Sequence, residues 1–311
     1  MKEVKIMLLS VQSGDVVYDL GFETGYRMIR EAGFEAIDWN IDNGWDHQAA
    51  VEGRIGESIF TKSPEEVLAY YADELAEIRK NGLVITQAHA PFPSFRRNNP
   101  DFLDYAIENI KSSILLCDAV GCKRLVVHGI SRRYGAPEMT EEKVRELNMK
   151  LYGSLIPVLQ ETDVTVCLEN LFTGSVPAVE GTCCDPLEAV SLIDTLNEMA
   201  GKECFGFCLD TGHLNLFKKF VPAYVHTLGK RIKALHLHDN DSIRDQHLMP
   251  FVGCFHWDEF ITALREIGYD GDLNFETFAQ ILPNRMAPDY IPVFLRAIAG
   301  IGDIFRQKIQ N

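Results

Sequence analysis

Short apolar runs alternate with longer segments of helical periodicity along the whole chain. The segment 63–82 has complete helix punctuation: Ser63 is a candidate N-cap, Glu66 can close a capping box with it, and Gly82 marks the stop. We expect strands at 4–11, 35–41, 83–92, 124–130, 164–171, 205–213, 231–239 and 271–278. We expect helices at about 25–33, 63–82, 101–120, 141–160, from 185 onward, and at 222–230, 257–267 and 289–305. The pattern is therefore eight strand–helix units in succession.

The expected strands are continuous apolar runs, which is typical of parallel strands whose two faces are both covered by helices. No Gly-, Ser- or Pro-rich linker and no long charged run interrupts the series. We therefore predict an α/β protein, a single (β/α)8 TIM-barrel domain over residues 1–311. A doubly wound open sheet is the alternative, but no GxGxxG motif follows the first run and no GxxxxGKS or GxxxxGKT motif occurs.

Composition narrows the range of partners. The 45 acidic and 30 basic residues give a net charge of −15, and that field repels nucleic-acid phosphates. No apolar run approaches the roughly 20 residues of a membrane span, and the N-terminal run is too short for a signal peptide. The eight cysteines form no CxxC pair. We expect a cytoplasmic protein with reduced thiols and neither a membrane nor a nucleic-acid partner.

Ionisable side chains stand at the ends of six expected strands. In a (β/α)8 barrel the carboxyl ends of all strands meet at one mouth, where active sites lie. Taken singly, such a residue is more often a hydrogen-bonded core group or a helix cap. Together, anionic groups in one cavity would raise each other's pKa, and a divalent cation removes that cost. The residues are His89, His128, Glu169, Asp210, His213, His238 and Glu276.

We expect four of these residues to bind one divalent metal ion: Glu169, Asp210, His238 and Glu276. Three carboxylates and one imidazole suit Mn, Mg, Co or Zn. His236 and His238 share a face of their strand because they lie two residues apart. His238 is nearer the strand end, whereas His236 is expected one layer below, where it can orient a ligand. Trp39 is a candidate wall for a sugar ring, with packing at the rim as the alternative.

Four short motifs carry a family resemblance: LEN at 168–170, DTGH at 210–213, HLHD at 236–239 and ETF at 276–278. In series they resemble the xylose-isomerase-like barrel superfamily, in particular its sugar-phosphate isomerase and epimerase branch. The resemblance implies that one divalent metal ion is held by the four ligands above, and that Glu169 and Glu276 also act as acid and base on opposite faces of a substrate. It further implies a small-molecule carbohydrate substrate that is contacted by His213 and Arg244.

The resemblance also extends to apurinic endonucleases of the endonuclease IV type, which hold three zinc ions with nine residues. All nine residue types are present here. Beyond the four expected ligands they are His89, His128, His213, Asp245 and His247, which could hold a second metal or contact substrate. The acidic balance weighs against this alternative, because phosphate contacts dominate DNA binding.

The favoured activity is proton transfer on a sugar, a sugar phosphate or a keto-inositol. One glutamate removes a proton beside a carbonyl group, the metal stabilises the enediolate, and the other glutamate returns a proton. The product is an epimer or an isomer. A metal-dependent keto-sugar lyase or dehydratase shares the first step, and a non-enzymatic sugar-binding barrel is a further alternative. The sequence leaves open which sugar and metal are used, and whether the chain forms a homo-oligomer.

Overall fold

The computed structural model describes residues 7–132, 138–174, 176–277 and 288–311. The chain divides into two compact units, which we call unit 1 and unit 2. Unit 1 comprises Met1–Trp39, Glu74–Thr86 and Leu209–Asn311, and unit 2 comprises Asn40–Asp73 and Gln87–Cys208. Each unit is described by itself below. The expectation of a single domain over residues 1–311 stays a prediction.

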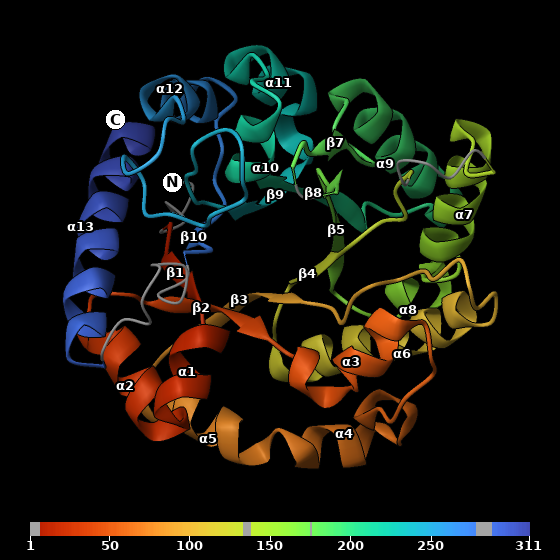
Figure 1. Cartoon of the computed structure of the whole chain (residues 1–311). Coiled ribbons are helices and arrows are strands. Elements are labelled where there is room, and N and C mark those ends of the chain that lie inside the picture. The colour runs from red at the N-terminus through yellow and green to blue at the C-terminus, as the bar shows by residue number, and fades with distance from the viewer. Residues whose placement is uncertain (1–6, 133–137, 175, 278–287) are drawn as a thin grey trace. The chain divides into compact units, whose positions relative to one another are not determined.

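Unit 1 is built on parallel strands from both ends of the chain (Figure 1). Strand β1 (Leu9–Gln12) pairs in parallel with β2 (Ala36–Asn40) on one side and with β10 (Leu273–Phe275) on the other. Leu237, directly after β9 (Ile232–His236), forms a parallel bridge with Phe275. Its helices are α1 (Gly14–Leu20), α2 (Phe22–Glu31), α10 (Thr211–Leu216), α11 (Val221–Leu228), α12 (Trp257–Glu266) and α13 (Ile291–Gln310).

Unit 2 contains the second set of parallel strands. Strand β3 (Val84–His89) pairs with β4 (Arg124–Val127), β4 pairs with β5 (Thr165–Glu169), and β5 pairs with β8 (Phe205–Asp210). The last residues of β8 belong to unit 1, as do the first residues of β3. The helices of unit 2 are α3 (His47–Glu52), α4 (Pro64–Tyr70), α6 (Phe102–Val120), α7 (Glu141–Gly153), α8 (Ile156–Gln160) and α9 (Pro186–Ala200). Helix α5 (Ala72–Lys80) passes from unit 2 into unit 1.

Eight parallel strands that alternate with helices are the (β/α)8 order expected from the sequence. Smaller elements were not anticipated: the hairpin β6 (Phe172–Thr173) and β7 (Val179–Glu180), and 3-10 turns at Asp42–Gly44, Ile59–Thr61, Gly229–Arg231 and Pro288–Tyr290. The expected first strand began at residue 4, and residues 1–6 lie outside the described part of the chain.

The expected helix over 63–82 forms as two helices, α4 and α5. Its capping box is confirmed: the Ser63 hydroxyl accepts from the Glu66 amide at 3.3 Å, and the Glu66 carboxylate accepts from the Ser63 amide at 3.0 Å. The break falls at Tyr71, where ψ is 5° and the buried hydroxyl donates to the Ile41 carbonyl at 2.8 Å. A tertiary hydrogen bond within unit 2 therefore fixes the residue at which α4 ends.

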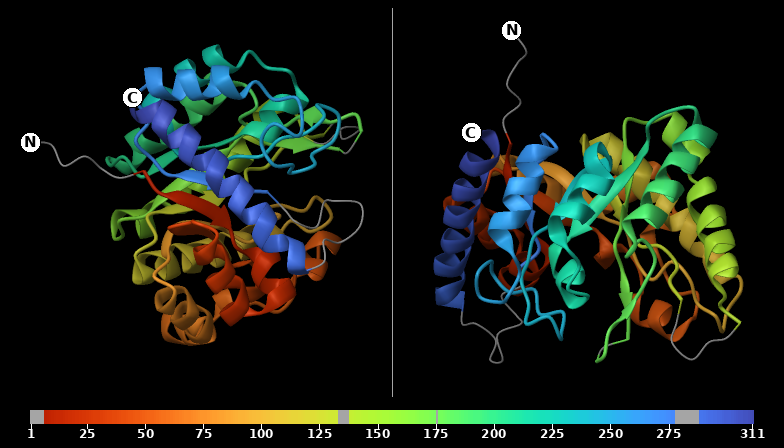
Figure 2. Two further views of the ribbon diagram at one scale, coloured as in Figure 1. Left: turned by 90° about the vertical axis from the view of Figure 1, so that its left-hand side faces the viewer. Right: turned by 90° about the horizontal axis from the view of Figure 1, so that it is seen from above.

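The core of unit 1 is rich in aromatic rings that join strands to helices. The ring of Phe275 in β10 lies 6.4 Å from Phe34 and 6.4 Å from Phe305 of α13, and Trp257 of α12 stacks on Phe305 at 5.3 Å. These contacts fix the inner face of α13 against unit 1, and Figure 2 shows the length of this helix.

The structure bears on two expectations from the sequence, the absence of a membrane span and the reduced state of the thiols. None of the described helices combines the length and the apolar character that crossing a membrane requires. All eight cysteines are free thiols, and only Cys254 is exposed.

Candidate metal and substrate site

Asp210 ends β8 and begins α10, so its carboxylate lies where a strand turns into a helix. One oxygen, Oδ1, accepts the His213 amide at 2.6 Å, which caps the helix. The other, Oδ2, lies 2.9 Å from Nε2 of His238. The expected strand over 205–213 is therefore three residues too long, because Asp210 caps a helix that the sequence pattern did not indicate. Asp210 and His238 are both fully buried.

Gly212 in this helix provides the space for His238. A Cβ atom at position 212 would lie 1.9 Å from Cε1 of the His238 ring. Any side chain there would displace the imidazole, because no real Cβ contact is that short. The glycine of the DTGH motif is thus required by the close approach of a candidate ligand.

His238 also faces the loop that follows β9. Its ring stacks on His247 with centroids 3.9 Å apart and an interplanar angle of 9°, and its Nδ1 lies 3.9 Å from Oδ1 of Asp245. Oδ2 of Asp245 contacts Nε2 of His247 at 2.8 Å and Nε2 of His213 at 3.5 Å. His247 has a φ of 48°, a left-handed conformation that is costly for a residue with a Cβ. Such strain is found mainly at functional sites.

Opposite charges in this loop shift two pKa values. Burial raises the pKa of Asp245, but His213 and His247 outweigh burial and hold that pKa well below its usual range. Burial lowers the pKa of His247, but Glu276 and Asp245 outweigh burial and raise the pKa to about 9. At neutral pH these interactions favour an ionised Asp245 beside a protonated His247.

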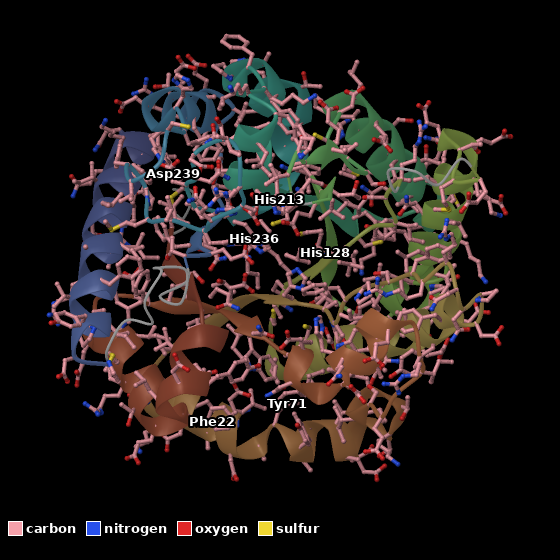
Figure 3. The ribbon with its side chains drawn as sticks, viewed as in Figure 1. Phe22, Tyr71, His128, His213, His236 and Asp239 are labelled. Atoms are coloured by element: carbon pink, nitrogen blue, oxygen red, sulfur yellow. The ribbon has the colours of Figure 1, made fainter. Side chains whose placement is uncertain are left out.

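Glu276 lies on the other side of His236. Its Oε2 is 3.3 Å from Nδ1 of His236, and Nε2 of His236 is 3.2 Å from Oδ2 of Asp38. Asp38 in turn accepts from Asn274 at 3.0 Å. His236 is fully buried, as expected for a residue one layer below the strand end. Glu276 also reaches the loop, since its backbone carbonyl lies 2.9 Å from Nδ1 of His247. Figure 3 labels His213 and His236 in this region.

A divalent cation fits this part of unit 1. Two sets of three ligand atoms lie within 4.8 Å of one another: Asp210, His213 and His238 in one set, and His238, Asp245 and His247 in the other. His238 belongs to both. Nδ1 of His238 and Oδ1 of Asp245 are buried and make no hydrogen bond within the described part of the chain. Buried polar atoms without partners are costly, and an imidazole nitrogen and a carboxylate oxygen are atom types that can bind a divalent metal ion.

Asp239 anchors the loop that carries Asp245 and His247. Its fully buried carboxylate accepts from the backbone amides of Asn240, Phe251 and Phe255 at 2.9 to 3.1 Å, and from the indole of Trp257 at 2.9 Å. The sequence pattern placed Asp239 at the end of the expected strand over 231–239 and indicated no role for it. The role of this buried anion is to fold residues 240–256 back onto β9.

Unit 2 carries a separate cluster of three expected residues. His128 Nε2 lies 2.9 Å from Oε2 of Glu169 and 3.1 Å from Nε2 of His89, and His89 Nε2 is 3.9 Å from the same carboxylate oxygen. Phe92 packs beside both imidazoles, with ring centroids at 5.3 Å from His89 and 4.7 Å from His128. Three ligand atoms within 4.8 Å make this cluster a second place that suits a metal ion.

Two expected substrate residues differ in accessibility. Arg244 is exposed, and its backbone amide donates to Asp241 at 2.9 Å, so its proposed role as a substrate clamp stays a prediction. Trp39 is 0% exposed, and its indole lies near the buried carboxylate of Glu74. A ring with no exposed surface cannot form a wall for a substrate in this structure. The packing alternative therefore describes Trp39 better.

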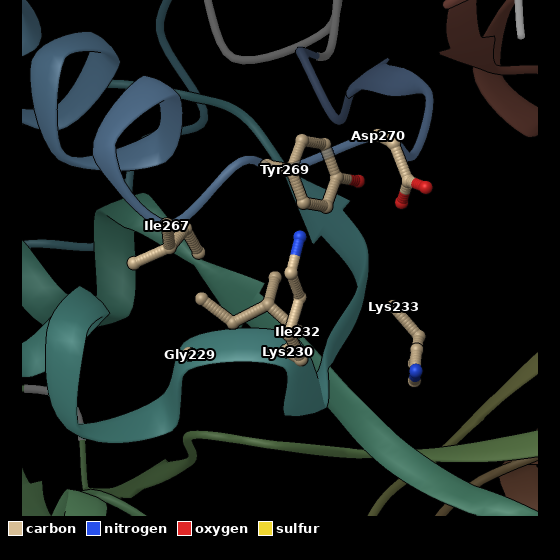
Figure 4. A pocket seen from close by; sticks show the side chains of 7 residues that line it. All are labelled: Gly229, Lys230, Ile232, Lys233, Ile267, Tyr269 and Asp270. Atoms are coloured by element: carbon tan, nitrogen blue, oxygen red, sulfur yellow. The ribbon is translucent and has the colours of Figure 1, made fainter. Parts of the chain in front are cut away.

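Unit 1 also has a small cavity at the opposite end of β9 (Figure 4). Its volume is about 210 Å³, and Lys230, Ile232, Lys233, Tyr269 and Asp270 are among its lining residues. Lys230 donates to the Gly268 carbonyl and Tyr269 donates to the Asp272 carbonyl. This cavity contains none of the expected site residues.

The chain belongs to the xylose isomerase-like TIM barrel family, which it matches over residues 26–296. This membership confirms the fold class and the resemblance that the four motifs indicated. A relative of similar length, uncharacterized protein y4fM of Sinorhizobium fredii, is 27% identical over 273 residues, which cover 84% of this chain and 82% of that protein.

Two further comparisons are with proteins whose names describe different activities. A D-tagatose 3-epimerase-like protein of solved structure superposes with a TM-score of 0.68 at 19% identity, covering 97% of this chain and 100% of that one. Probable endonuclease 4 of Mycoplasma pneumoniae is 29% identical over 143 residues, 46% of this chain and 44% of that protein. The first likeness shows a shared fold. The second covers less than half of the chain.

Proposed function

We propose that the protein is a metal-dependent sugar isomerase or epimerase that transfers a proton beside a carbonyl group. The observation that carries the proposal is the group of buried imidazoles and carboxylates at the strand ends of unit 1, with His238 at its centre and Glu276 beside it. Solved sugar epimerases are among the structures of the same fold, which supports a carbohydrate substrate of small size.

His238, which the sequence predicted as a ligand, is the proposed metal ligand in unit 1 through Nδ1, and Asp245 joins it through Oδ1. Asp210, also predicted as a ligand, contacts the opposite nitrogen of His238 at 2.9 Å and is proposed to orient its ring. The support for Asp245 is the facing pair of buried atoms, His238 Nδ1 and Asp245 Oδ1, at 3.9 Å. A divalent metal bound here would supply Lewis-acid polarisation of the substrate's carbonyl group. The donor set of imidazole and carboxylate suits Mn, Zn, Co or Mg.

Glu276 is the proposed acid–base residue of unit 1. Its carboxylate is half-buried and faces His236, which has the carboxylate of Asp38 on its other side. This arrangement can hold Glu276 in one orientation, because His236 is fully buried between two carboxylates. Glu276 would remove the proton from the substrate carbon or return it, depending on the direction of the reaction.

The roles that the sequence predicts for Glu169 of unit 2, acid–base catalysis and metal binding, stay predictions. Glu169 ends β5 and is buried, with 2% of its surface exposed. His213 and Arg244 are the proposed substrate contacts. His213 is 8% exposed and its imidazole is held 3.5 Å from Asp245, so it is a rigid candidate, whereas Arg244 is exposed.

The test is exchange of the substrate's carbon-bound proton with deuterated water. The wild-type protein, loaded with Mn, Co or Zn, is incubated with a panel of ketoses, keto-inositols and their phosphates, and deuterium uptake is followed by mass spectrometry. Glu276→Gln should keep the fold and lower the exchange rate by at least about 100-fold. Glu266→Gln, at an exposed carboxylate that pairs with His226, is the control. Undiminished exchange in Glu276→Gln would contradict the assignment.

A DNA-repair hydrolase of the endonuclease IV type is the second candidate. The cluster of His89, His128 and Glu169 in unit 2 favours it, because one metal ion in unit 1 leaves His89 and His128 without a function. The partial likeness to probable endonuclease 4 points the same way. Metal analysis distinguishes the two, since the epimerase proposal expects one ion per chain and the hydrolase expects three. Cleavage of an oligonucleotide with one abasic site tests the hydrolase directly.

A further inference from the structure

The outer face of α13 carries an exposed apolar stripe. Tyr290, Val293, Ala297, Gly300, Ile304 and Gln307 follow one another at alternating spacings of three and four residues, so they form one seam along the helix. We call these six residues the outer stripe. Tyr290, Val293 and Ile304 are 64%, 57% and 54% exposed, and Ala297 and Gly300 are exposed as well.

No described element lies in front of this face. In the left view of Figure 2, α13 runs across the side nearest the viewer, and the described parts of unit 1 lie behind it. The opposite face of the helix is the one that packs, through buried residues such as Leu295, Ile298 and Phe305. The outer stripe is therefore a second apolar face on a helix whose first face already fixes it to unit 1.

No contact within one copy of the chain accounts for the presence of glycine at position 300. It lies in the middle of a 20-residue helix, where glycine costs about 1 kcal/mol relative to alanine. A Cβ at this position would meet nothing within 4 Å, so no contact within the chain requires glycine. A small residue in an exposed helical seam allows a second helix to approach closely.

We propose that the outer stripe is the contact face of a homodimer, in which α13 of two copies pack antiparallel about a twofold axis. The stripe is self-complementary in that arrangement. An axis that passes midway between residues 298 and 299 brings Val293 against Ile304 of the second copy, and Ala297 against Gly300. Large residues then meet at both ends and small residues meet at the centre, as an isologous interface requires.

The charged residues beside the outer stripe also favour antiparallel packing of the two helices. Arg296 and Asp303 flank the seam on one side, and both are exposed. In the antiparallel pair, Arg296 of one copy lies within two residues, or about 3 Å along the axis, of Asp303 of the other, and symmetry forms this pair twice. Arg296 has no ion pair within the described part of the chain, and Asp303 pairs with Arg306 of the same helix. A parallel pair would instead bring Arg296 near Ile301.

A single helix pair buries less area than a stable interface, which needs about 1,200 to 2,000 Å². We therefore expect a dimer that dissociates on dilution. Sedimentation velocity of the full chain, from about 1 to 100 μM, should show a shift from the 35.1 kDa monomer to twice that mass. A chain that stays monomeric at the highest concentration overturns the proposal.

Gly300→Arg tests the seam. The position has open space around it and arginine is a better helix former than glycine, so the variant should keep its circular dichroism spectrum and have an equal or higher melting temperature, while the dimer dissociation constant rises at least about tenfold. Leu187→Arg, which adds the same charge at a 67% exposed residue of α9, is the matched control and should leave the dissociation constant unchanged. An unchanged dissociation constant in Gly300→Arg places the interface elsewhere and overturns the proposal.

A charge exchange tests the orientation. Arg296→Asp and Asp303→Arg should each weaken the dimer by about tenfold, because each places like charges together at both symmetric positions. The double variant Arg296→Asp/Asp303→Arg restores opposite charges and should recover the dissociation constant to within about threefold. Failure of the double variant to recover contradicts antiparallel packing, since a loss of helix stability alone would add up in the double variant.

Discussion

Nδ1 of His238 faces Oδ1 of Asp245 across 3.9 Å, and neither atom makes a hydrogen bond within the described residues. The other nitrogen of His238 is held by Asp210, and the other oxygen of Asp245 is held by His247. Asp210 and His247 therefore hold the two side chains in place, while Nδ1 of His238 and Oδ1 of Asp245 remain directed at each other. This arrangement supports the proposal that the two facing atoms bind a metal ion while Asp210 and His247 orient the side chains.

Replacement of Asp245 by asparagine tests this centre. Asparagine keeps the shape but removes the charge, so affinity for Mn, Co or Zn should fall at least about tenfold. Because a metal that binds only the folded state stabilises it, added metal should raise the melting temperature of the wild-type protein and chelator should lower it, with a smaller change in Asp245→Asn. Titration with metal under calorimetry gives the affinities.

The control for this prediction is Asp270→Asn, which removes one exposed carboxylate from unit 1. It should bind metal as the wild-type protein does. A wild-type protein whose melting temperature does not respond to any of these metals would contradict the assignment of a metal centre.

Replacement of Gly212 by alanine should remove the space that His238 occupies. The new Cβ would lie 1.9 Å from the His238 ring, so the imidazole has to rotate away from Asp210. We expect a loss of stability of about 1 to 3 kcal/mol together with loss of bound metal. Gly153→Ala, where the nearest atom is 3.9 Å away, is the matched control and should keep the metal content. Equal metal content in both variants would show that the ring position does not matter.

The sequence was sufficient to predict the strands and the ionisable residue types at their ends, because both follow from local pattern. The alternation of apolar runs with helical segments predicted eight strand–helix units, and the ends of those runs named Asp210, His238 and Glu276. Spacing of two residues also placed His236 below His238. These features need only the periodicity of a strand and the common direction of parallel strands.

The sequence pattern could not predict contacts between segments that lie far apart along the chain. Asp38 meets His236, 198 positions along the chain, only because β2 and β9 belong to the same unit. The same is true of Trp39, whose aromatic character suggested a substrate wall but whose side chain is buried with Glu74. The need for glycine at position 212 could have been suspected from the DTGH motif, but its reason is a contact with His238 that only the fold creates.

Replacement of Asp239 by alanine should unfold the loop that carries Asp245 and His247. Three backbone amides and one indole lose their shared acceptor, and buried donors without partners cost about 1 to 3 kcal/mol each. We expect a loss of at least about 3 kcal/mol in denaturant unfolding, and weaker metal binding as well. Asp241→Ala is the comparison, since Asp241 is exposed and caps two amides of the same loop at 2.9 Å. A smaller loss in Asp239→Ala than in Asp241→Ala would refute the anchor role.

The pair of Tyr26 and Glu74 predicts a pH dependence that is independent of the metal centre. Burial raises the pKa of Glu74, and the hydrogen bond from Tyr26, at 2.5 Å, together with the nearby indole of Trp39 offsets only part of that rise. The folded state therefore binds this proton more tightly than the unfolded state. The resulting stability is fully present below the unfolded pKa of about 4.3 and is lost as the pH rises through the folded value.

Glu74→Gln should remove this loss. The amide oxygen can still accept from Tyr26, and no proton is released, so the variant should gain stability relative to the wild-type protein as the pH rises from about 4 to 8. Melting temperatures measured across that range, without metal, give the difference directly, and titration of the metal-site residues cancels because it is common to both proteins. Asp73→Asn, at an exposed carboxylate in the same helix, should show a flat difference. A flat difference for Glu74→Gln as well would mean that the pKa of Glu74 is not raised in the folded protein.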